Sequence, residues 1–187
     1  MFTIIDYSRE RYLTLGLQAI AAHAQHGTRK RCIVVPDRER PLSSLLAFRQ
    51  EHAGRWQDVI VLLDALSAPV ATAVMGTEHR VSMAGRRESP AVMLSLMNQM
   101  SREKAVPFLP ARGALTPVEI QLALSLRSEL SPEQIAGMLQ KSVKTLSAQK
   151  RRIMEKLGVS GNVMFMKLVA DPAFIQTMAL LSAQWSG

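Results

Sequence analysis

"SPEQIAGMLQKSVKTLSAQKRRIMEKLGV", residues 131–159, contains two helix signals and a cluster of basic residues. It opens with Ser131, then a proline, then Gln134, which is the spacing of a helix capping box. After Ser142, apolar residues recur at helical spacing until Gly158, which supplies a left-handed stop. These apolar residues are Leu146, Ile153 and Leu157. The stretch therefore predicts a short helix followed by a longer one that runs to Leu157.

The longer helix has two different faces. At about 100° per residue, its three apolar residues share one face. The opposite face carries Lys144, Ser147, Ala148, Arg151, Arg152 and Glu155. A short helix followed by a longer one with an apolar back and a cationic front is typical of a helix-turn-helix, whose recognition helix enters the DNA major groove. The alternative is that the basic residues only solvate an exposed helix; the capping boxes, the spacing and the apolar back favour the first interpretation.

The reach of each side chain predicts its role on DNA. Long cations and a hydroxyl on the flanks can contact phosphates, and we assign Lys144, Thr145, Lys150 and Arg152 to this group. On the central front, an arginine can pair with guanine, a serine with several bases and an alanine with a thymine methyl group. The residues predicted to contact bases are Ser147, Ala148 and Arg151.

Helical signals extend to both sides of this stretch. Thr116, Pro117 and Glu119 form a second capping box, fifteen residues before the first. A fourth helix is expected at about 162–170, and after Asp171 a short amphipathic tail has an apolar stripe. The stripe consists of Phe174, Met178, Leu181 and Trp185. We therefore predict a helix-turn-helix domain with a short C-terminal amphipathic helix at 116–187.

The first hundred residues follow another pattern, in which short β-branched runs alternate with helical stretches. Strands are expected at 2–5, 32–35, 58–63 and, more weakly, 79–83, and helices at 9–25, 41–53, 68–75 and 89–102. This alternation predicts an α/β domain with parallel strands at 1–103. Two prolines and a glycine without periodicity indicate a linker at 104–115.

Composition limits the functional class. The formal net charge of +8 and the pI near 10.3 permit binding to a polyanion. Cys32 lies in the apolar run "CIVV", which predicts a buried thiol, and a single cysteine suits a reducing cytosol. No stretch reaches about 18 uninterrupted apolar residues, and the start lacks the apolar core of a signal peptide. We expect a soluble cytoplasmic protein without a membrane segment.

The sequence contains few motifs that would indicate catalysis, phosphate binding or metal binding. It lacks a glycine-rich phosphate loop and a nucleophile elbow. His23 and His26 are three residues apart on an expected helix, but no third metal-ligand type lies near them. We expect a protein that is not an enzyme, with no catalytic residue, cofactor or metal.

Residues 115–170 resemble the LuxR-type helix-turn-helix domain of bacterial transcription regulators. The motif stands here as Leu115-Thr116-Pro117, Glu119, Leu130-Ser131, Gln134-Ile135-Ala136, Leu139, Lys144-Thr145-Leu146, Ile153 and Lys156-Leu157-Gly158-Val159. The resemblance implies a four-helix DNA-binding domain with the helix from Val143 to Leu157 in the groove. It also implies that the fourth helix serves dimerisation.

The chain departs from that family pattern at four positions. Glu129 stands where a glycine is usual, and Gln149 where a histidine is usual in the recognition helix. Ile120 and Leu124 replace positions that are usually polar and exposed. These two apolar side chains either pack under the other domain or belong to a partner surface.

In this class the front domain is often a phosphoacceptor receiver, which needs an acidic pair, an acceptor aspartate and a late lysine. Here Asp6 is followed by Tyr7, so only one acid of the pair remains. The acceptor position falls at Asp37 or Asp64. About forty residues after Asp64 are too few for the usual remainder, so we favour Asp37, as a vestigial phosphoacceptor in a receiver-like fold shortened by one strand-helix unit. Met83 lies near the place of the lysine, and a methionine cannot neutralise phosphate.

A degenerate receiver joined to this helix-turn-helix is similar to the auxiliary regulators of capsule and surface-structure genes. That resemblance implies a phosphorylation-independent, sequence-specific transcription regulator that binds double-stranded DNA. It would act as a homodimer or as a heterodimer with a phosphorylatable regulator of the same class. The alternative is a regulatory protein-binding module whose helix-turn-helix contacts another regulator and has little DNA affinity of its own.

Overall fold

The computed structural model describes residues 1–25, 27–64, 66, 68–76, 79–100, 115–128 and 130–183. The described residues up to Asp64 and from Met75 through the fourth helix belong to one compact unit. Leu66, residues 68–74 and the described residues from Leu115 onward group together as another. The sequence-predicted linker at 104–115 lies almost entirely outside the described residues. The proposed domain limits therefore stay predictions.

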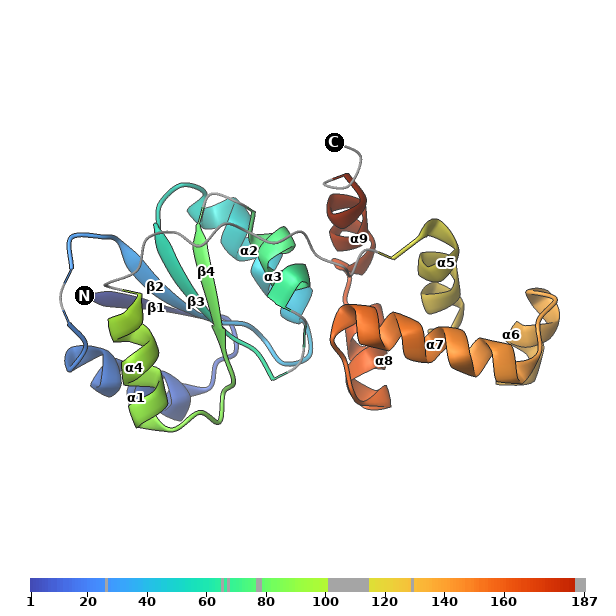
Figure 1. The fold of residues 1–187 in the computed structure, drawn as a ribbon, viewed down its shortest axis with the longest axis horizontal. Helices are drawn as coiled ribbons and strands as arrows, with labels where there is room; N and C mark the ends of the chain where they lie inside the picture. The colour runs from blue at the N-terminus through green and yellow to red at the C-terminus, as the bar shows by residue number, and fades with distance from the viewer. Residues whose placement is uncertain are drawn as a thin grey trace. The chain divides into compact units, whose positions relative to one another are not determined.

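The first unit contains a four-stranded parallel sheet (Figure 1). Its strands are β1 (Phe2–Asp6), β2 (Arg31–Val35), β3 (Asp58–Leu62) and β4 (Arg80–Ala84), hydrogen-bonded in that order. The strands are followed in the chain by α1 (Arg11–Ala22), α2 (Pro41–His52), α3 (Ala68–Met75) and α4 (Pro90–Gln99). The predicted alternation of strands and helices is confirmed, with ends that differ by a few residues.

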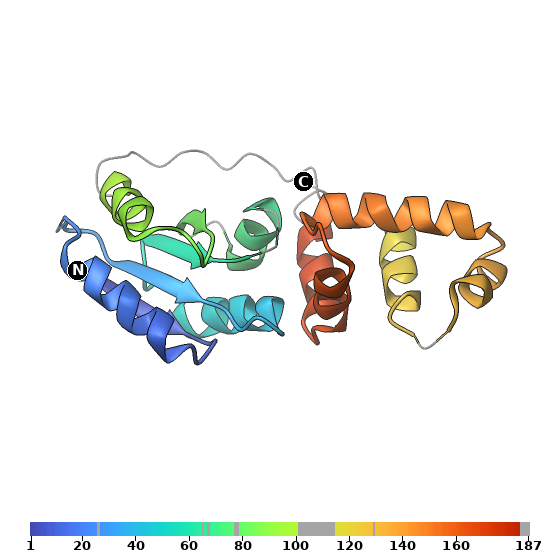
Figure 2. The same ribbon diagram turned by 90° about the horizontal axis from the view of Figure 1, so that it is seen from below.

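Burial explains why the apolar runs form the central strands. Every residue of β2 and β3 is buried, as expected for parallel strands covered on both faces. On one face, Ile33 and Ile60 pack with Leu17 of α1 and Met97 of α4. Figure 1 shows α1 and α4 on that side of the sheet and α2 on the other, and Figure 2 shows α1 and α4 near opposite edges of the sheet. Cys32 is fully buried as predicted, and burial raises the pKa of its thiol to about 12.

The strand order shows how the sheet is shortened. Receiver-type sheets have the order 2-1-3-4-5, and removal of the second strand leaves 1-3-4-5. The sequential order β1-β2-β3-β4 matches that remainder. β1 is therefore an edge strand, whereas the corresponding strand of the complete fold is paired on both sides.

The second unit is helical throughout its described residues. From Leu115 onward it contains α5 (Pro117–Ser125), α6 (Pro132–Met138), α7 (Val143–Leu157), α8 (Asn162–Ala170) and α9 (Phe174–Ala183). Both predicted capping boxes are present, at Thr116 with Glu119 and at Ser131 with Gln134. Gly158 ends α7 with a φ of 71°, a conformation that a residue with a Cβ adopts only at a cost. The predicted fold class, a shortened receiver-like α/β domain followed by a helical helix-turn-helix domain, is confirmed.

Two helices of the second unit are strongly apolar. No single described helix is long and apolar enough to cross a membrane. The segments Asn162–Ala170 and Phe174–Leu180 reach that length and composition only as a pair, and they meet at 86°. Phe165, Phe174 and Met178, which belong to these two segments, are almost fully buried.

Candidate nucleic-acid interface

The apolar back of α7 is its docking surface within the second unit. Leu146, Ile153 and Leu157 are at most 2% exposed, and α7 packs against both α5 and α6. An ion pair of 2.7 Å between Lys156 Nζ and Glu119 Oε2 ties α7 to α5. Burial raises the pKa of the Glu119 carboxyl, but hydrogen bonds from Lys156 and Thr116 outweigh it, so the pKa lies below its ordinary value. The orientation of α7 is therefore set by both packing and charge.

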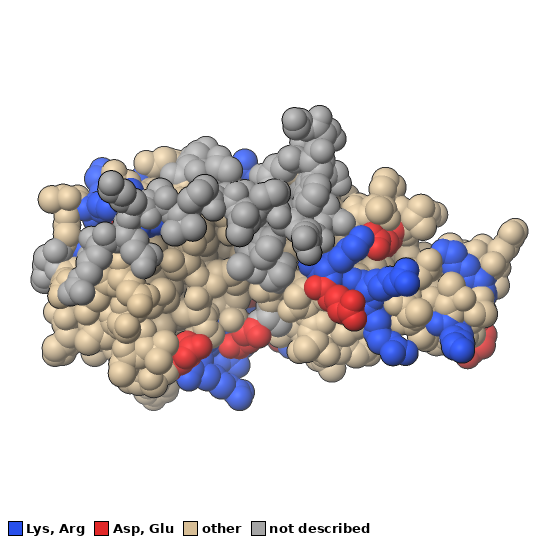
Figure 3. Space-filling model, viewed as in Figure 1, with Lys and Arg blue, Asp and Glu red and all other residues tan. Residues whose placement is uncertain are grey.

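The opposite face of α7 is open and cationic. Lys144, Arg151 and Arg152 are exposed, and none forms a hydrogen bond or ion pair with another described residue. The predicted contact residues Thr145, Ser147 and Ala148 are exposed as well. Lys and Arg atoms gather over α7 in Figure 3, with a few carboxylates between them. Arg151 and the small side chains at 147 and 148 lie on the central front, where a helix backbone can approach a groove closely.

Lys150 differs from the other predicted contact residues. It follows Leu146 by four positions, which puts it only about 40° from the centre of the apolar face. Lys150 Nζ donates a hydrogen bond to Asn162 Oδ1 and lies 5.5 Å from the centroid of the Phe165 ring. The side chain is half-buried against α8. The structure thus places Lys150 beside α8, away from the exposed front.

The turn before α7 is closed by its own hydrogen bonds. Ser142 Oγ accepts from the Thr145 amide at 3.1 Å and pairs with the Thr145 hydroxyl at 2.8 Å. Lys141 Nζ donates to Gln149 Oε1 at 2.9 Å, so the glutamine at the usual histidine position joins the turn to the middle of α7. Gln140 has a φ of 51°, which lets the chain reverse between α6 and α7. These contacts hold the first turn of α7 relative to α6.

The other departures from the family pattern have mixed outcomes. Ile120 and Leu124 on α5 are half-buried. Their two predicted roles, packing under the other domain or belonging to a partner surface, both stay open.

Glu129 and His26 lie outside the described residues, and His23 Nδ1 pairs with the carbonyl of Ala19. Within the described ranges no group of three His, Cys, Asp or Glu side chains could hold a metal ion.

The carboxyl ends of the strands hold an arginine that the sequence interpretation missed. Arg86 follows β4, and its side chain is only 3% exposed. Arg86 Nη1 lies 3.0 Å from Glu10 Oε1, Nε lies 3.8 Å from Asp64 Oδ2, and Nη2 donates to the carbonyl of Pro36. Burial lowers the pKa of this guanidinium, and the two carboxylates counteract that effect only in part. One buried cation therefore joins the loops after β1, β2, β3 and β4.

The remaining acids at this edge of the sheet are also engaged. Asp37 Oδ1 accepts hydrogen bonds from the amides of Glu39 and Arg40 at 2.7 and 3.0 Å. Asp6 accepts from Thr14 and Ser8, and these bonds hold its pKa below the ordinary value although burial raises it. Met83, predicted near the lysine position, is a half-buried residue of β4. The cation that pairs with Glu10 and Asp64 at this edge belongs to Arg86, three residues after Met83.

Comparison with solved structures agrees with this architecture. A structure described as two RcsB dimers bound to two parallel DNAs has a TM-score of 0.56 at 16% identity, covering 95% of this chain and 98% of that one. The two-component response regulator RcsB in a DNA complex gives 0.53 at 17% identity with the same coverage. RcsB from Salmonella enterica serovar Typhimurium, bound to the rprA promoter with beryllofluoride, gives 0.54 at 15%, covering 91% and 98%. Neither a protein-family model nor a curated protein matches this sequence.

These findings define a class by fold. The chain has a response-regulator-like fold, in which a parallel-sheet domain precedes a helix-turn-helix domain. Its described residues form four parallel strands, where receiver-type sheets have five, and Arg86 is ion-paired with Glu10 and Asp64 at the carboxyl edge of the sheet.

Proposed function

We propose that this chain is a sequence-specific DNA-binding transcription regulator of the LuxR type. It works without phosphorylation, as a dimer or as a heterodimer with a response regulator of the same class. The observation that carries the proposal is the exposed front of α7, where Lys144, Arg151 and Arg152 stand around two small residues. Solved structures with the same fold, described as RcsB bound to DNA, support it.

The position of each basic residue on α7 decides the role that we propose for it on DNA. Arg151 lies on the central front beside Ser147 and Ala148, so it would read a guanine edge in the major groove. Lys144 lies at the start of the helix, where its ammonium would contact a phosphate and set register. Lys150 is already hydrogen-bonded to Asn162 and would contribute less than either.

Independence of phosphorylation is supported by the contacts of Arg86. A receiver binds a divalent cation and a phosphoryl group at the carboxyl edge of its sheet. Here the Arg86 guanidinium lies between Glu10 and Asp64, and the Asp37 carboxylate caps its own loop. The carboxylates of Glu10 and Asp64 are therefore already paired with a buried cation, and an Asp37 oxygen already accepts two amide hydrogen bonds. We therefore expect Mg²⁺ with beryllofluoride to leave DNA affinity unchanged, and a changed affinity would contradict this part of the proposal.

The DNA proposal is tested by recovering bound fragments from a random pool with the purified protein, alone and mixed with candidate regulators of the same class. Selective recovery in either arm supports DNA reading, and selectivity only in the mixture supports the heterodimer. No recovery in both arms would favour the protein-binding alternative.

Binding of variants to the recovered DNA site then tests the role of each residue. Arg151→Ala should cost about 1 to 3 kcal/mol there and blur specificity at one base pair. Lys144→Ala should weaken all sequences about evenly. Arg87→Ala and Lys30→Ala, which remove exposed cations of the first unit, are the matched controls. Wild-type affinity and specificity in both α7 variants would refute the assignment.

A further inference from the structure

The open edge of the sheet at β1 has a defined hydrogen-bonding pattern. The Tyr7 amide donates to the carbonyl of Val35 at 2.9 Å, so Tyr7 points its polar backbone groups toward β2. The N–H and C=O groups of successive residues in a strand point alternately to one side and the other. The N–H and C=O groups of Thr3 and Ile5 therefore face β2, and those of Phe2, Ile4 and Asp6 face outward. In the described part of the chain no strand pairs with that outer side.

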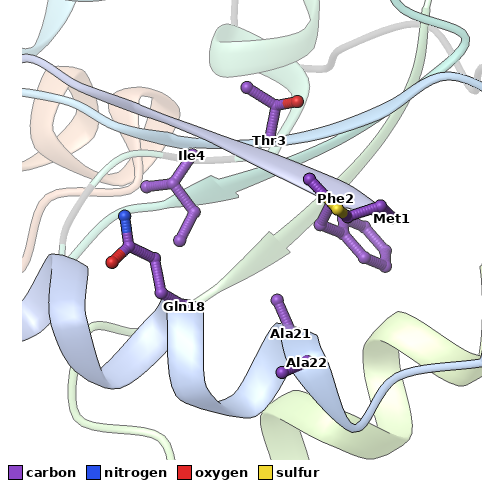
Figure 4. Close-up of a pocket in the computed structure, with 7 residues that line it drawn as sticks. All are labelled: Met1, Phe2, Thr3, Ile4, Gln18, Ala21 and Ala22. Carbon is purple, nitrogen blue, oxygen red and sulfur yellow. The ribbon is translucent and has the colours of Figure 1, made fainter.

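An apolar groove lies along this edge. It has a volume of about 610 Å³ and is lined by residues of β1 and α1, including Phe2, Ile4, Gln18 and Ala22. Figure 4 shows Phe2 and Ile4 extending from β1 toward α1, with Gln18 and Ala22 on the helix facing the same space. The residues that line the groove carry no side-chain charge. Leu15, on the exposed side of α1, is 51% exposed.

Soluble proteins usually protect an edge strand with a lysine, a proline, a bulge or a covering segment. β1 has no lysine or proline, and its only charged residue is Asp6 at its end. An unprotected edge beside an apolar groove is typical of a surface that is covered in the assembled protein.

We propose that β1 pairs with β1 of a second copy of this chain, antiparallel and centred on Ile4. In that register Ile4 faces Ile4 of the second copy, and Phe2 faces Asp6. These are the residues whose backbone groups point outward, so every pair exchanges two hydrogen bonds, about six in all. The pairing is closed under twofold symmetry. The two sheets become one sheet of eight strands.

Charge and side-chain size fit the same register. Asp6 lies opposite Phe2 and not opposite its own copy, so no like charges are brought together. Thr3 lies opposite Ile5 on the other face of the sheet, a β-branched pair suited to close cross-strand contact. The twofold axis brings α1 beside α1 of the second copy, where Leu15 and the groove are covered. This dimer requires no DNA, so its test is separate from that of the proposed function.

Sedimentation of the full chain, without DNA, tests the interface. Ile4→Pro should give a folded monomer, because the lost N–H points outward and edge strands tolerate proline. Leu15→Glu should weaken the dimer by more than about tenfold, since a symmetric interface contains the change twice. Val92→Glu is the matched control, at 49% exposure on α4, and should leave the dimer intact. A monomeric wild type at micromolar concentration, or a dimer unaffected by Leu15→Glu, would overturn the proposal.

Cysteine pairs test the register itself. Cys32 is the β2 partner of Thr3, so both variants are made in a Cys32→Ala background. Residues 3 and 5 of opposite copies would form a non-hydrogen-bonded pair with Cα atoms about 4.5 Å apart, within disulfide reach. Thr3→Cys with Ile5→Cys should therefore yield a covalent dimer on mild oxidation. Thr3→Cys alone should not, because its own copies lie about 8 Å apart diagonally. Equal cross-linking of both variants would exclude this pairing even if a dimer forms.

Discussion

Replacement of Arg86 by methionine should destabilise the first unit by about 2 kcal/mol. Removal of one partner from a buried ion pair costs about 3 to 5 kcal/mol, because the other charge is left buried. Here the Glu10 and Asp64 side chains remain 29% and 35% exposed, so water can replace part of the lost interaction. Glu10 also keeps Arg38 Nε at 2.6 Å from its Oε1. We therefore expect a loss below the full range.

Urea unfolding followed by tryptophan fluorescence measures this loss. Trp56 lies in the first unit and is buried, so a Trp185→Phe background makes it the sole tryptophan reporter. Arg87→Met is the matched control, because this neighbouring arginine is exposed and should change stability by no more than about 0.5 kcal/mol. Arg86→Lys should be intermediate, since one ammonium cannot reproduce the planar fork of a guanidinium. Equal unfolding midpoints for Arg86→Met and Arg87→Met would refute the structural role of Arg86.

Two further predictions concern the second unit. Because the folded-state pKa of Glu119 lies below its ordinary value of 4.5, its pairing with Lys156 stabilises the fold fully above that pH and is lost as the pH falls below it. In Glu119→Gln, the free energy of unfolding, followed by circular dichroism, should fall less as the pH is lowered below that value. The same acid-induced loss as in the wild type would contradict the ion pair. Gly158→Ala should cost about 1 kcal/mol in thermal unfolding, because its φ of 71° is left-handed, and an unchanged midpoint would argue against that conformation.

Short-range patterns made much of the fold predictable. The capping boxes at Thr116 and Ser131 and the stop at Gly158 depend on residues within a few positions of one another, so the sequence contains the whole signal. The buried strands β2 and β3 are continuous apolar runs, which have few other structural explanations. The exposed front of α7 followed from its helical period alone.

The features that escaped prediction depend on distant partners. Arg86 meets Glu10, which is 76 residues earlier in the chain, and only the order of the strands brings them together. The adjacent arginines of "GRRES" after the fourth strand were the available signal for a cation at this edge. The resemblance to receivers instead places the expected lysine near Met83. Lys150 was predicted to flank the front from the reach of its long side chain. Its contact with Asn162 depends on where α8 packs.

The most direct test of the DNA-reading front is the salt dependence of binding to the recovered site. Logarithmic affinity should fall steeply and linearly with logarithmic salt, because each neutralised phosphate releases about 0.9 counterion. A triple variant, Lys144→Ala with Arg151→Ala and Arg152→Ala, should have a slope that is shallower by up to about 3 units. The account predicts that difference, together with lost site preference. A wild-type slope and preference in the triple variant would contradict it.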